Sequence, residues 1–295
     1  MNQLSLFGRM DTDRVVNVAS VKQRSPFRYA GGKTWLVPRV RGWFSYLSEA
    51  PDYFVEPFAG GGIVSLTVAA ERLAKHVIMI EIDQQVASVW KTIIADEGGG
   101  EWLAQQILRL RMSREEAMRI IGGSPASTRE LAFQTIVKNR VYHGGILAPG
   151  AAPLKNGENG RGIASRWYPE TLARRIREIV AIRERITFVE GDGLDYLARY
   201  AEQERTVYFI DPPYTAGSKK AGSRLYTHFS LDHRLLFDLT ARLKGRFLMT
   251  YDNDEAIVRL AEEHGFGYAT VAMTNTHHAN MKEMLISRDV SWVSG

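Results

Sequence analysis

Short apolar runs alternate with longer amphipathic stretches over most of the chain. The short runs are rich in β-branched and aromatic residues, which is typical of buried strands. They predict strands at residues 53–55, 76–80, 186–189, 206–210, 247–251, 268–273 and 283–287. The amphipathic stretches predict helices at residues 63–73, 83–95, 194–201, 231–243 and 254–264. This alternation predicts an α/β fold with a predominantly parallel sheet that is covered by helices.

The alternation is interrupted in the middle of the chain. Residues 143–166 are rich in Gly, Pro and Asn, and a loop of this length in a compact domain usually has a function or is disordered. The segments around this loop predict helices at 102–121, 128–142 and 169–185. We therefore predict an inserted, mainly helical domain. The predicted parts are an N-terminal extension at 1–25, an α/β domain at 26–97 and 186–295, and the insertion at 98–185.

Composition and length narrow the class of protein. The chain has 295 residues, with 45% hydrophobic and 24% charged residues, which indicates a globular protein with a sizeable core. No apolar run reaches the roughly 18 residues that cross a bilayer, and the polar amino terminus does not resemble a secretory signal. We therefore expect a cytoplasmic protein. Because the chain has 0 cysteines, thiolate zinc clusters and cysteine nucleophiles are excluded, and with them covalent cytosine C5 methylation.

The positive charge is concentrated in the predicted insertion. The whole chain has 38 basic and 33 acidic residues, whereas residues 101–185 contain 15 basic and 8 acidic ones. A basic block in an otherwise slightly acidic protein favours a polyanionic partner. Helices with solvated basic faces explain the same charge, and charge alone leaves both interpretations open.

Three predicted strand ends carry residues suited to binding. In open parallel sheets, ligands bind beyond the carboxyl ends of the strands. The first strand ends in a glycine loop, residues 56–62, which allows close approach of the backbone to a ligand. Glu81 ends the next strand, where a carboxylate can accept the hydroxyl hydrogens of a ribose. A plain turn and a solvated surface carboxylate explain these two features equally well.

The third strand end, Asp211-Pro212-Pro213-Tyr214, is the most informative segment of the chain. The two prolines remove two backbone donors and leave carbonyl acceptors beside a carboxylate and an aromatic ring. An exocyclic base amine offers two N–H donors on a flat ring. Asp211 and the carbonyl of Pro212 can accept both hydrogens while Tyr214 stacks on the base, as enzymes that act on flipped bases require.

Together these segments resemble a known family. With Arg28-Tyr29-Ala30-Gly31-Gly32-Lys33 upstream, the glycine loop and the Asp-Pro-Pro-Tyr segment resemble the signature set of the S-adenosylmethionine-dependent DNA adenine-N6 methyltransferases, alpha group, the family of the Dam methylase. The order of the motifs around an inserted target-recognition domain is the same, and the similarity spans about residues 26–286. The resemblance implies a Rossmann-like methyltransferase domain with an inserted, mainly helical DNA-recognition subdomain.

The resemblance also implies roles for individual residues. It implies catalytic roles for Asp211, Pro212, Pro213 and Tyr214. It implies that the methyl donor, S-adenosyl-L-methionine, is bound by Tyr29, Lys33, Phe58, Gly60, Glu81, Asp192 and Asp211, with Lys33 on its carboxylate, Glu81 on its ribose and Asp192 near its adenine. DNA contacts are predicted for residues at and around the Gly-rich loop, namely Lys138, Asn139, Arg140, Lys155, Arg161 and Arg166.

The expected function is therefore site-specific methylation of adenine N6 in double-stranded DNA, without a metal. The family often has Asp at the position of Glu81 and Trp at that of Tyr29, and the 143–166 loop does not match, so no target sequence is transferred. N4-cytosine or RNA methylation, and a DNA-binding module without catalysis, remain open. A cognate restriction endonuclease is compatible with the resemblance. A nicotinamide dehydrogenase is disfavoured because the glycine loop lacks the G-x-G-x-x-G spacing and the Asp-Pro-Pro-Tyr segment would have no role.

Overall fold

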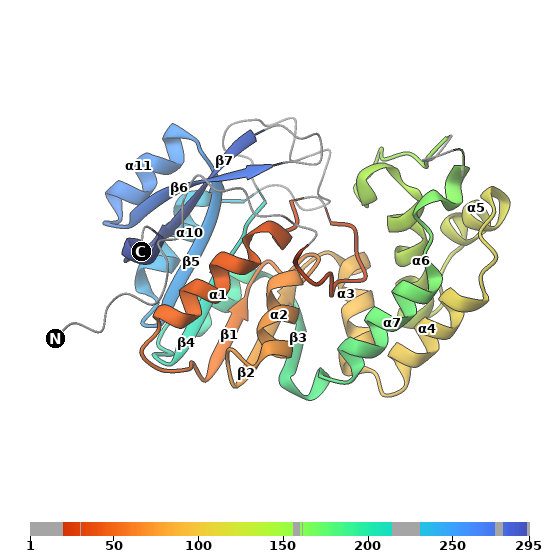
Figure 1. Ribbon diagram of the computed structural model, residues 1–295, viewed down its shortest axis with the longest axis horizontal. Helices are drawn as coiled ribbons and strands as arrows, with labels where there is room; N and C mark the ends of the chain where they lie inside the picture. Colours follow the sequence, from red (N-terminus) through yellow and green to blue (C-terminus); the bar gives the residue numbers. More distant parts are fainter. Residues whose placement is uncertain are drawn as a thin grey trace.

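The protein is built on one mixed sheet of seven strands with helices on both faces (Figure 1). The computed structural model describes residues 20–29, 31–155, 160, 162–213, 231–274 and 280–293. The strand order is β3-β2-β1-β4-β5-β7-β6. In chain order the strands are β1 (Tyr53–Glu56), β2 (His76–Glu81), β3 (Ile186–Glu190), β4 (Thr206–Ile210), β5 (Arg246–Asp252), β6 (Gly267–Thr274) and β7 (Asn280–Ser287).

The predicted α/β fold is confirmed, and every predicted strand is present. Strands β1 to β5 pair in parallel, whereas β7 runs antiparallel to both β5 and β6. The long antiparallel β6–β7 pair closes one end of the sheet, next to β5 (Figure 1). The β5–β7 register sets Asp252 opposite Glu283, so a carboxylate of each strand reaches the carboxyl end of β5.

Alternating apolar residues of the strands fill two separate cores. Phe54 of β1 packs into the core beneath α1 (Val37–Tyr46), α2 (Ile63–Glu71) and α3 (Gln84–Trp90). The next residue, Val55, packs into the core beneath α8 (Gly193–Arg199), α10 (His233–Arg242) and α11 (Glu255–Glu263). Since successive side chains of a strand point to opposite faces, a strand buried on both faces is apolar throughout.

The segment between β2 and β3 forms a helical lobe beside the sheet (Figure 1). A π-helical turn, Lys91–Ala95, extends α3 toward this lobe. The lobe contains α4 (Gly99–Arg109), α5 (Arg114–Gly122), α6 (Thr128–Val141) and α7 (Pro169–Val180). Short 3₁₀ turns occupy His143–Gly145 and Gly162–Arg166 within the Gly-rich segment. The remaining 3₁₀ turns are Thr34–Leu36, Arg183–Arg185 and Ser291–Val293.

One sequence-based prediction about helices was wrong, and one helix was missed. The single helix predicted at 102–121 is two helices, because the chain leaves the helical conformation after Arg109 and Ser113 caps the second helix by accepting from the backbone N–H of Glu116. Helix α1 was not predicted, since its apolar residues are interrupted by Pro38 and Gly42. Among the described helices, none combines the length and apolarity that a membrane crossing requires.

Candidate functional site

The candidate site lies where the direction of the sheet connections reverses. Strands β1 and β4 are parallel neighbours, and the helix after β1 covers one face whereas α10, the described helix that follows β4, covers the other. Such a reversal opens a crevice at the carboxyl ends of the two strands. The glycine loop leaves β1 at this edge, and Asp211 follows the last residue of β4.

The glycine loop has a backbone that only glycine accommodates well. Gly60 has φ +46° and Gly62 has φ +64°, both in the left-handed region. A Cβ on Gly60 would lie 2.6 Å from Cε1 of Tyr29, so the tyrosine ring is packed directly on the loop. The indole N–H of Trp90 donates to the carbonyl of Gly60 at 2.9 Å. Tyr29 and Gly60, both predicted from the sequence, are therefore in contact.

Glu81 lies beside this loop at the end of β2. Its two carboxylate oxygens accept the backbone N–H groups of Gly60 and Asp83, each at 2.8 Å. Burial raises the pKa of Glu81 to about 7, although those backbone N–H groups oppose the shift. Because each oxygen has a second lone pair, Glu81 can hold the loop and still accept a ligand hydroxyl.

The residues around Glu81 complete this half of the site. Ile82, which the sequence analysis did not single out, is 42% exposed although it is aliphatic and directly follows a buried strand. Asp192 caps α8 by accepting from the backbone N–H of Leu194 at 2.8 Å. A Cβ on Gly193 would lie 2.3 Å from the carbonyl oxygen of Pro57, so the turn after β3 touches the loop after β1. Phe58 of that loop is partly exposed.

The Asp-Pro-Pro segment begins at the end of β4. The side chain of Asp211 keeps 20% of its surface exposed, and its Oδ1 accepts from the hydroxyl of Thr250 on β5 at 2.7 Å. Pro212 is buried and Pro213 is partly exposed. Tyr214, the fourth predicted catalytic residue, lies outside the described residues.

Lys33 is buried against Asp211. The residue is 4% exposed, and its ammonium lies 2.9 Å from Oδ1 of Asp211 and 3.2 Å from Oε1 of Glu283. It also donates to the carbonyl of Gly31 at 2.8 Å. An ammonium has three N–H donors, and three oxygens of the chain take them. The structure thus couples Lys33 to Asp211, whereas the resemblance implied the donor carboxylate as its partner.

Glu56 is a further buried carboxyl at this edge. Its Oε2 accepts from the backbone N–H of Ser65 at 3.0 Å and from the Ser65 hydroxyl. Burial raises the pKa of Glu56 to about 8; Ser65 opposes this shift, and the nearby charge of Asp211 adds to it. Glu56 and Glu283 were assigned no role from the sequence. A charged residue inside or at the end of an apolar strand is the signal that could have found them.

The predicted DNA contacts in the insertion divide into buried and exposed residues. Asn139 is fully buried, and its amide bonds to the backbone N–H and carbonyl of Arg28 and to the carbonyl of Gly145. Lys138 is partly buried and donates to Gln85 and to the carbonyl of Leu147. Lys155 is exposed, and Arg161 lies outside the described residues. Asn139 therefore joins the insertion to the segment that carries Tyr29 and is not a surface residue.

Arg140 and Arg166 belong to a group of four arginines that we call the arginine cluster: Arg28, Arg140, Arg166 and Arg175. Arg140 is 5% exposed, donates to the carbonyl of Pro26, and has a buried Nε without a hydrogen-bond partner among the described residues. Burial lowers the pKa of Arg140 to about 9, and repulsion from the other three arginines adds to this shift. Arg175 donates to the carbonyl of Ser25. The cluster therefore concentrates like charges at the junction of lobe and sheet.

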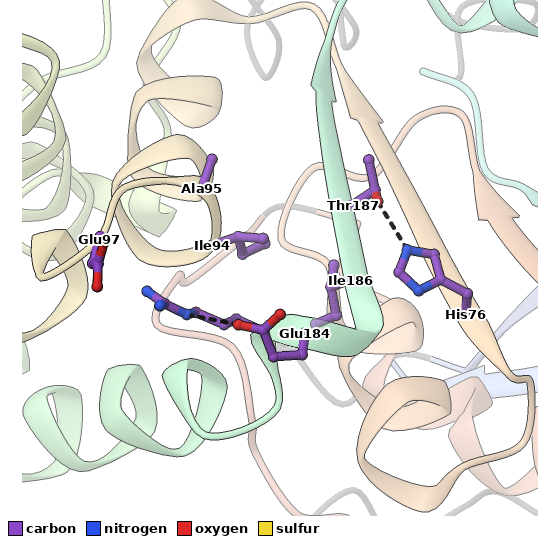
Figure 2. A pocket seen from close by; sticks show the side chains of 8 residues that line it. His76, Ile94, Ala95, Glu97, Glu184, Ile186 and Thr187 are labelled. Carbon is purple, nitrogen blue, oxygen red and sulfur yellow. Dashed lines mark hydrogen bonds and ion pairs between the residues drawn. The ribbon is translucent and has the colours of Figure 1, made fainter.

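Elsewhere, an open groove of about 410 Å³ lies beside the beginning of the edge strand β3 (Figure 2). Its lining includes His76, whose ring nitrogen lies 2.8 Å from the hydroxyl of Thr187. This groove lies at the amino-terminal ends of β2 and β3, at the opposite edge from Glu81 and Asp211. Within the described part of the chain, no group of three or more His, Asp or Glu side chains could hold a metal ion.

Three of the solved structures that are similar to this protein carry the names of methyltransferases. A Pyrococcus horikoshii protein proposed as an RNA methyltransferase has TM-score 0.41 and 9% identity, with 92% of each chain covered. A precorrin-6y C5,15-methyltransferase from Geobacter metallireducens has TM-score 0.39 and 12% identity, covering 88% of this chain and 91% of that one. The M1A22 tRNA methyltransferase of B. subtilis has TM-score 0.36 and 11% identity, covering 85% of this chain and 65% of that one.

The sequence comparison is more specific. Among curated proteins, none matches this chain significantly. Residues 29–119, which include Lys33, the glycine loop and Glu81, match the sequence model of the D12 class N6 adenine-specific DNA methyltransferases, and the family resemblance is thereby confirmed over this part of the chain.

Proposed function

We propose that the protein is an S-adenosylmethionine-dependent methyltransferase that acts on adenine N6 at specific sites in duplex DNA. The observation that carries this proposal is the position of Asp211 and its two prolines. The carboxylate stands partly exposed at the end of β4, directly beside the strand that carries the glycine loop. Acceptors for an exocyclic amine thus lie next to the edge at which the fold binds a nucleoside-containing ligand.

The residues at the ends of β1 and β2 fit a methyl donor of this kind. Glu81 has acceptor capacity left for ribose hydroxyls, and the exposed side chain of Ile82 offers an apolar surface for a purine ring. Asp192 stands near the same crevice, at the turn that touches Pro57. When bound, the donor supplies an electrophilic methyl group on a sulfonium sulfur. The residues of the chain bind and orient it, and Gly60 and Tyr29 shape the wall of its pocket.

Asp211 acts on the acceptor amine. The N6 lone pair of adenine is delocalised into the ring, which makes the amine a poor nucleophile. Hydrogen bonds from N6 to Asp211 and to the carbonyl of Pro212 favour a pyramidal nitrogen and stabilise the positive charge that develops on it. Asp211 therefore works by electrostatics and orientation, and the proton leaves after the methyl group has moved. Tyr214 is proposed to stack on the flipped base.

The helical insertion, residues 98–185, is proposed to bind DNA. The arginine cluster supports this assignment, because several guanidinium groups close to Arg140 concentrate positive charge at a place where phosphates could bind. Arg28 and Arg166 are partly exposed and are proposed to contact phosphates, and Lys155 with Arg161 would extend the contact along the loop. Arg140 and Asn139 are proposed to hold the 25–29 segment in place, since both bond to its backbone.

Product analysis tests the proposal. The purified protein is incubated with methyl-labelled S-adenosylmethionine and, in parallel reactions, with duplex DNA or with RNA, and the nucleosides are separated by mass. N6-methyladenine is expected, and its position in the sequenced DNA gives the recognition site. N4-methylcytosine, or label in RNA alone, would contradict the proposal. Asp211→Ala should abolish turnover while donor affinity changes by less than about tenfold, whereas Asp238→Ala on α10 should leave both unchanged.

A further inference from the structure

We propose that Glu283 is a positioning residue for Asp211, acting through Lys33. The proposal rests on the proposed function, in which Asp211 is the acceptor of the amine hydrogens. It concerns a residue of β7, about 70 positions away from the Asp-Pro-Pro segment in the sequence. The structure brings the two carboxylates to one ammonium, at 2.9 Å for Asp211 and 3.2 Å for Glu283.

Glu283 is a buried carboxylate that lies beside the ammonium of Lys33. The residue is 2% exposed, and its strand pairs with β5 so that it stands opposite Asp252. The next residue along that face, Leu285, packs into the core beneath α1. A carboxylate in such a place requires a partner of opposite charge, and Lys33 lies within ion-pair distance of it.

Sharing one cation controls the charge at the site edge. With a single carboxylate as partner, Lys33 would neutralise Asp211 by a full ion pair and weaken it as an acceptor for an amine. Because the Lys33 ammonium is shared between Glu283 and Asp211, its charge is only partly used by Asp211. Asp211 therefore retains negative charge toward the crevice. Thr250 donates from β5 to the same Oδ1 of Asp211 at 2.7 Å, so two neighbouring elements fix the position of this carboxylate.

Among the residues that the structure describes, charged groups from four elements lie around Lys33. Asp211 follows β4, Glu283 belongs to β7, Asp252 ends β5 and Glu56 ends β1, and the last two act on the network through space. Replacing Glu283 by the neutral Gln keeps the size and removes one charge. Lys33 then keeps its ion pair with Asp211 and loses the one with Glu283, which weakens Asp211 in the reaction without removing any group that is proposed to contact the donor or DNA.

Kinetics of matched variants test this role. Glu283→Gln should lower kcat on duplex DNA about 10- to 100-fold, the range expected for a misplaced catalytic group, with the KM for the donor and the DNA affinity within about twofold of wild type. Glu283→Asp should recover part of kcat. Glu263→Gln, which makes the same change in an exposed ion pair with Arg234, should behave as wild type. Wild-type kcat in Glu283→Gln, or a loss confined to the donor KM, would overturn the proposal.

A second measurement does not depend on activity. In protein labelled with ¹³C at aspartate, the Asp211 carboxyl signal is identified by its loss in Asp211→Asn. This signal should shift in Glu283→Gln and stay in place in Glu263→Gln. An unmoved signal overturns the role of Glu283 even if the protein methylates DNA. If the Asp211 signal shifts but the protein methylates no adenine in DNA, the coupling between Glu283 and Asp211 stands. In that case the proposed function is refuted.

Discussion

Replacing Glu56 by Gln should change how the stability of the protein depends on pH. The Glu56 carboxyl is buried at the end of β1, and its pKa is raised from its usual value of 4.5 to about 8 by burial. Between these two values the folded protein binds a proton that the unfolded chain has released. The free energy of unfolding therefore decreases as pH rises through this window, at roughly 1.4 kcal/mol per pH unit.

The size of the effect follows from the width of the window. Over the full interval this single group removes up to about 5 kcal/mol of stability, a large part of the total for a domain. Gln keeps the acceptor oxygen for Ser65 but cannot ionise. The difference in unfolding free energy between Glu56→Gln and wild type should thus grow in favour of the variant from pH 5 to pH 8. A pH-independent effect of the amide group on the unfolding free energy shifts this difference by the same amount at every pH and does not change its slope.

Urea unfolding followed by circular dichroism, at unit steps from pH 5 to pH 9, measures this difference. Glu81, whose pKa is also raised, is common to both proteins, so its contribution cancels. Glu263→Gln serves as the control, and its difference from wild type should remain flat because its ion pair is exposed. A flat line for Glu56→Gln as well would refute the reasoning, since it would mean that Glu56 is ionised in the folded protein.

Three further outcomes are expected. Lowering the pH from 8 to 6 should weaken donor binding in calorimetry, because burial raises the pKa of Glu81 to about 7 and protonation removes acceptor capacity for a ribose. Glu81→Gln should bind the donor weakly at both pH values, and an equal pH response in this variant would contradict the assignment. Asn139→Ala should reduce the unfolding free energy by about 3 kcal/mol, because it leaves backbone groups of Arg28 and Gly145 without partners; a loss below about 1 kcal/mol would contradict the contacts. Arg166→Gln should reduce the slope of log affinity for DNA against log salt by about 1, whereas an unchanged slope would remove Arg166 from the phosphate contacts.

The fold was largely predictable because its signals are local. The apolar strand 206–210 and the Asp-Pro-Pro segment after it stand next to each other in the sequence, and β4 is found where the pattern predicts it. The glycines at 60 and 62 likewise indicate a left-handed backbone conformation, which both residues adopt in the structure. Helix α1 was missed because its burial depends on packing against α2 and the carboxyl-terminal 3₁₀ turn, which no local pattern reveals.

The site was predictable only where its chemistry lies in contiguous motifs. The contact between Lys33 and Glu283 joins residues 250 positions apart, and its existence follows from the antiparallel return of β7 beside β5. Asn139 was predicted to contact DNA because it stands in a basic segment. Its complete burial follows from the position of α6 against the 25–29 segment, which charge patterns do not encode. Tertiary packing therefore decides between a surface role and an internal one.

The hydrogen bonds between the helical lobe and the 25–29 segment determine which residues must be moved together when lobes are exchanged between related proteins. Asn139, Arg140 and Arg175 all bond to backbone atoms of that segment, which precedes the sheet and yet is fastened by the lobe. A chimera that takes only residues 98–185 from a relative would place different side chains beside those backbone atoms. The hydrogen bonds would be lost, and the packing of Tyr29 on the glycine loop would weaken. The interchangeable unit consists of two pieces, and a successful transplant carries both.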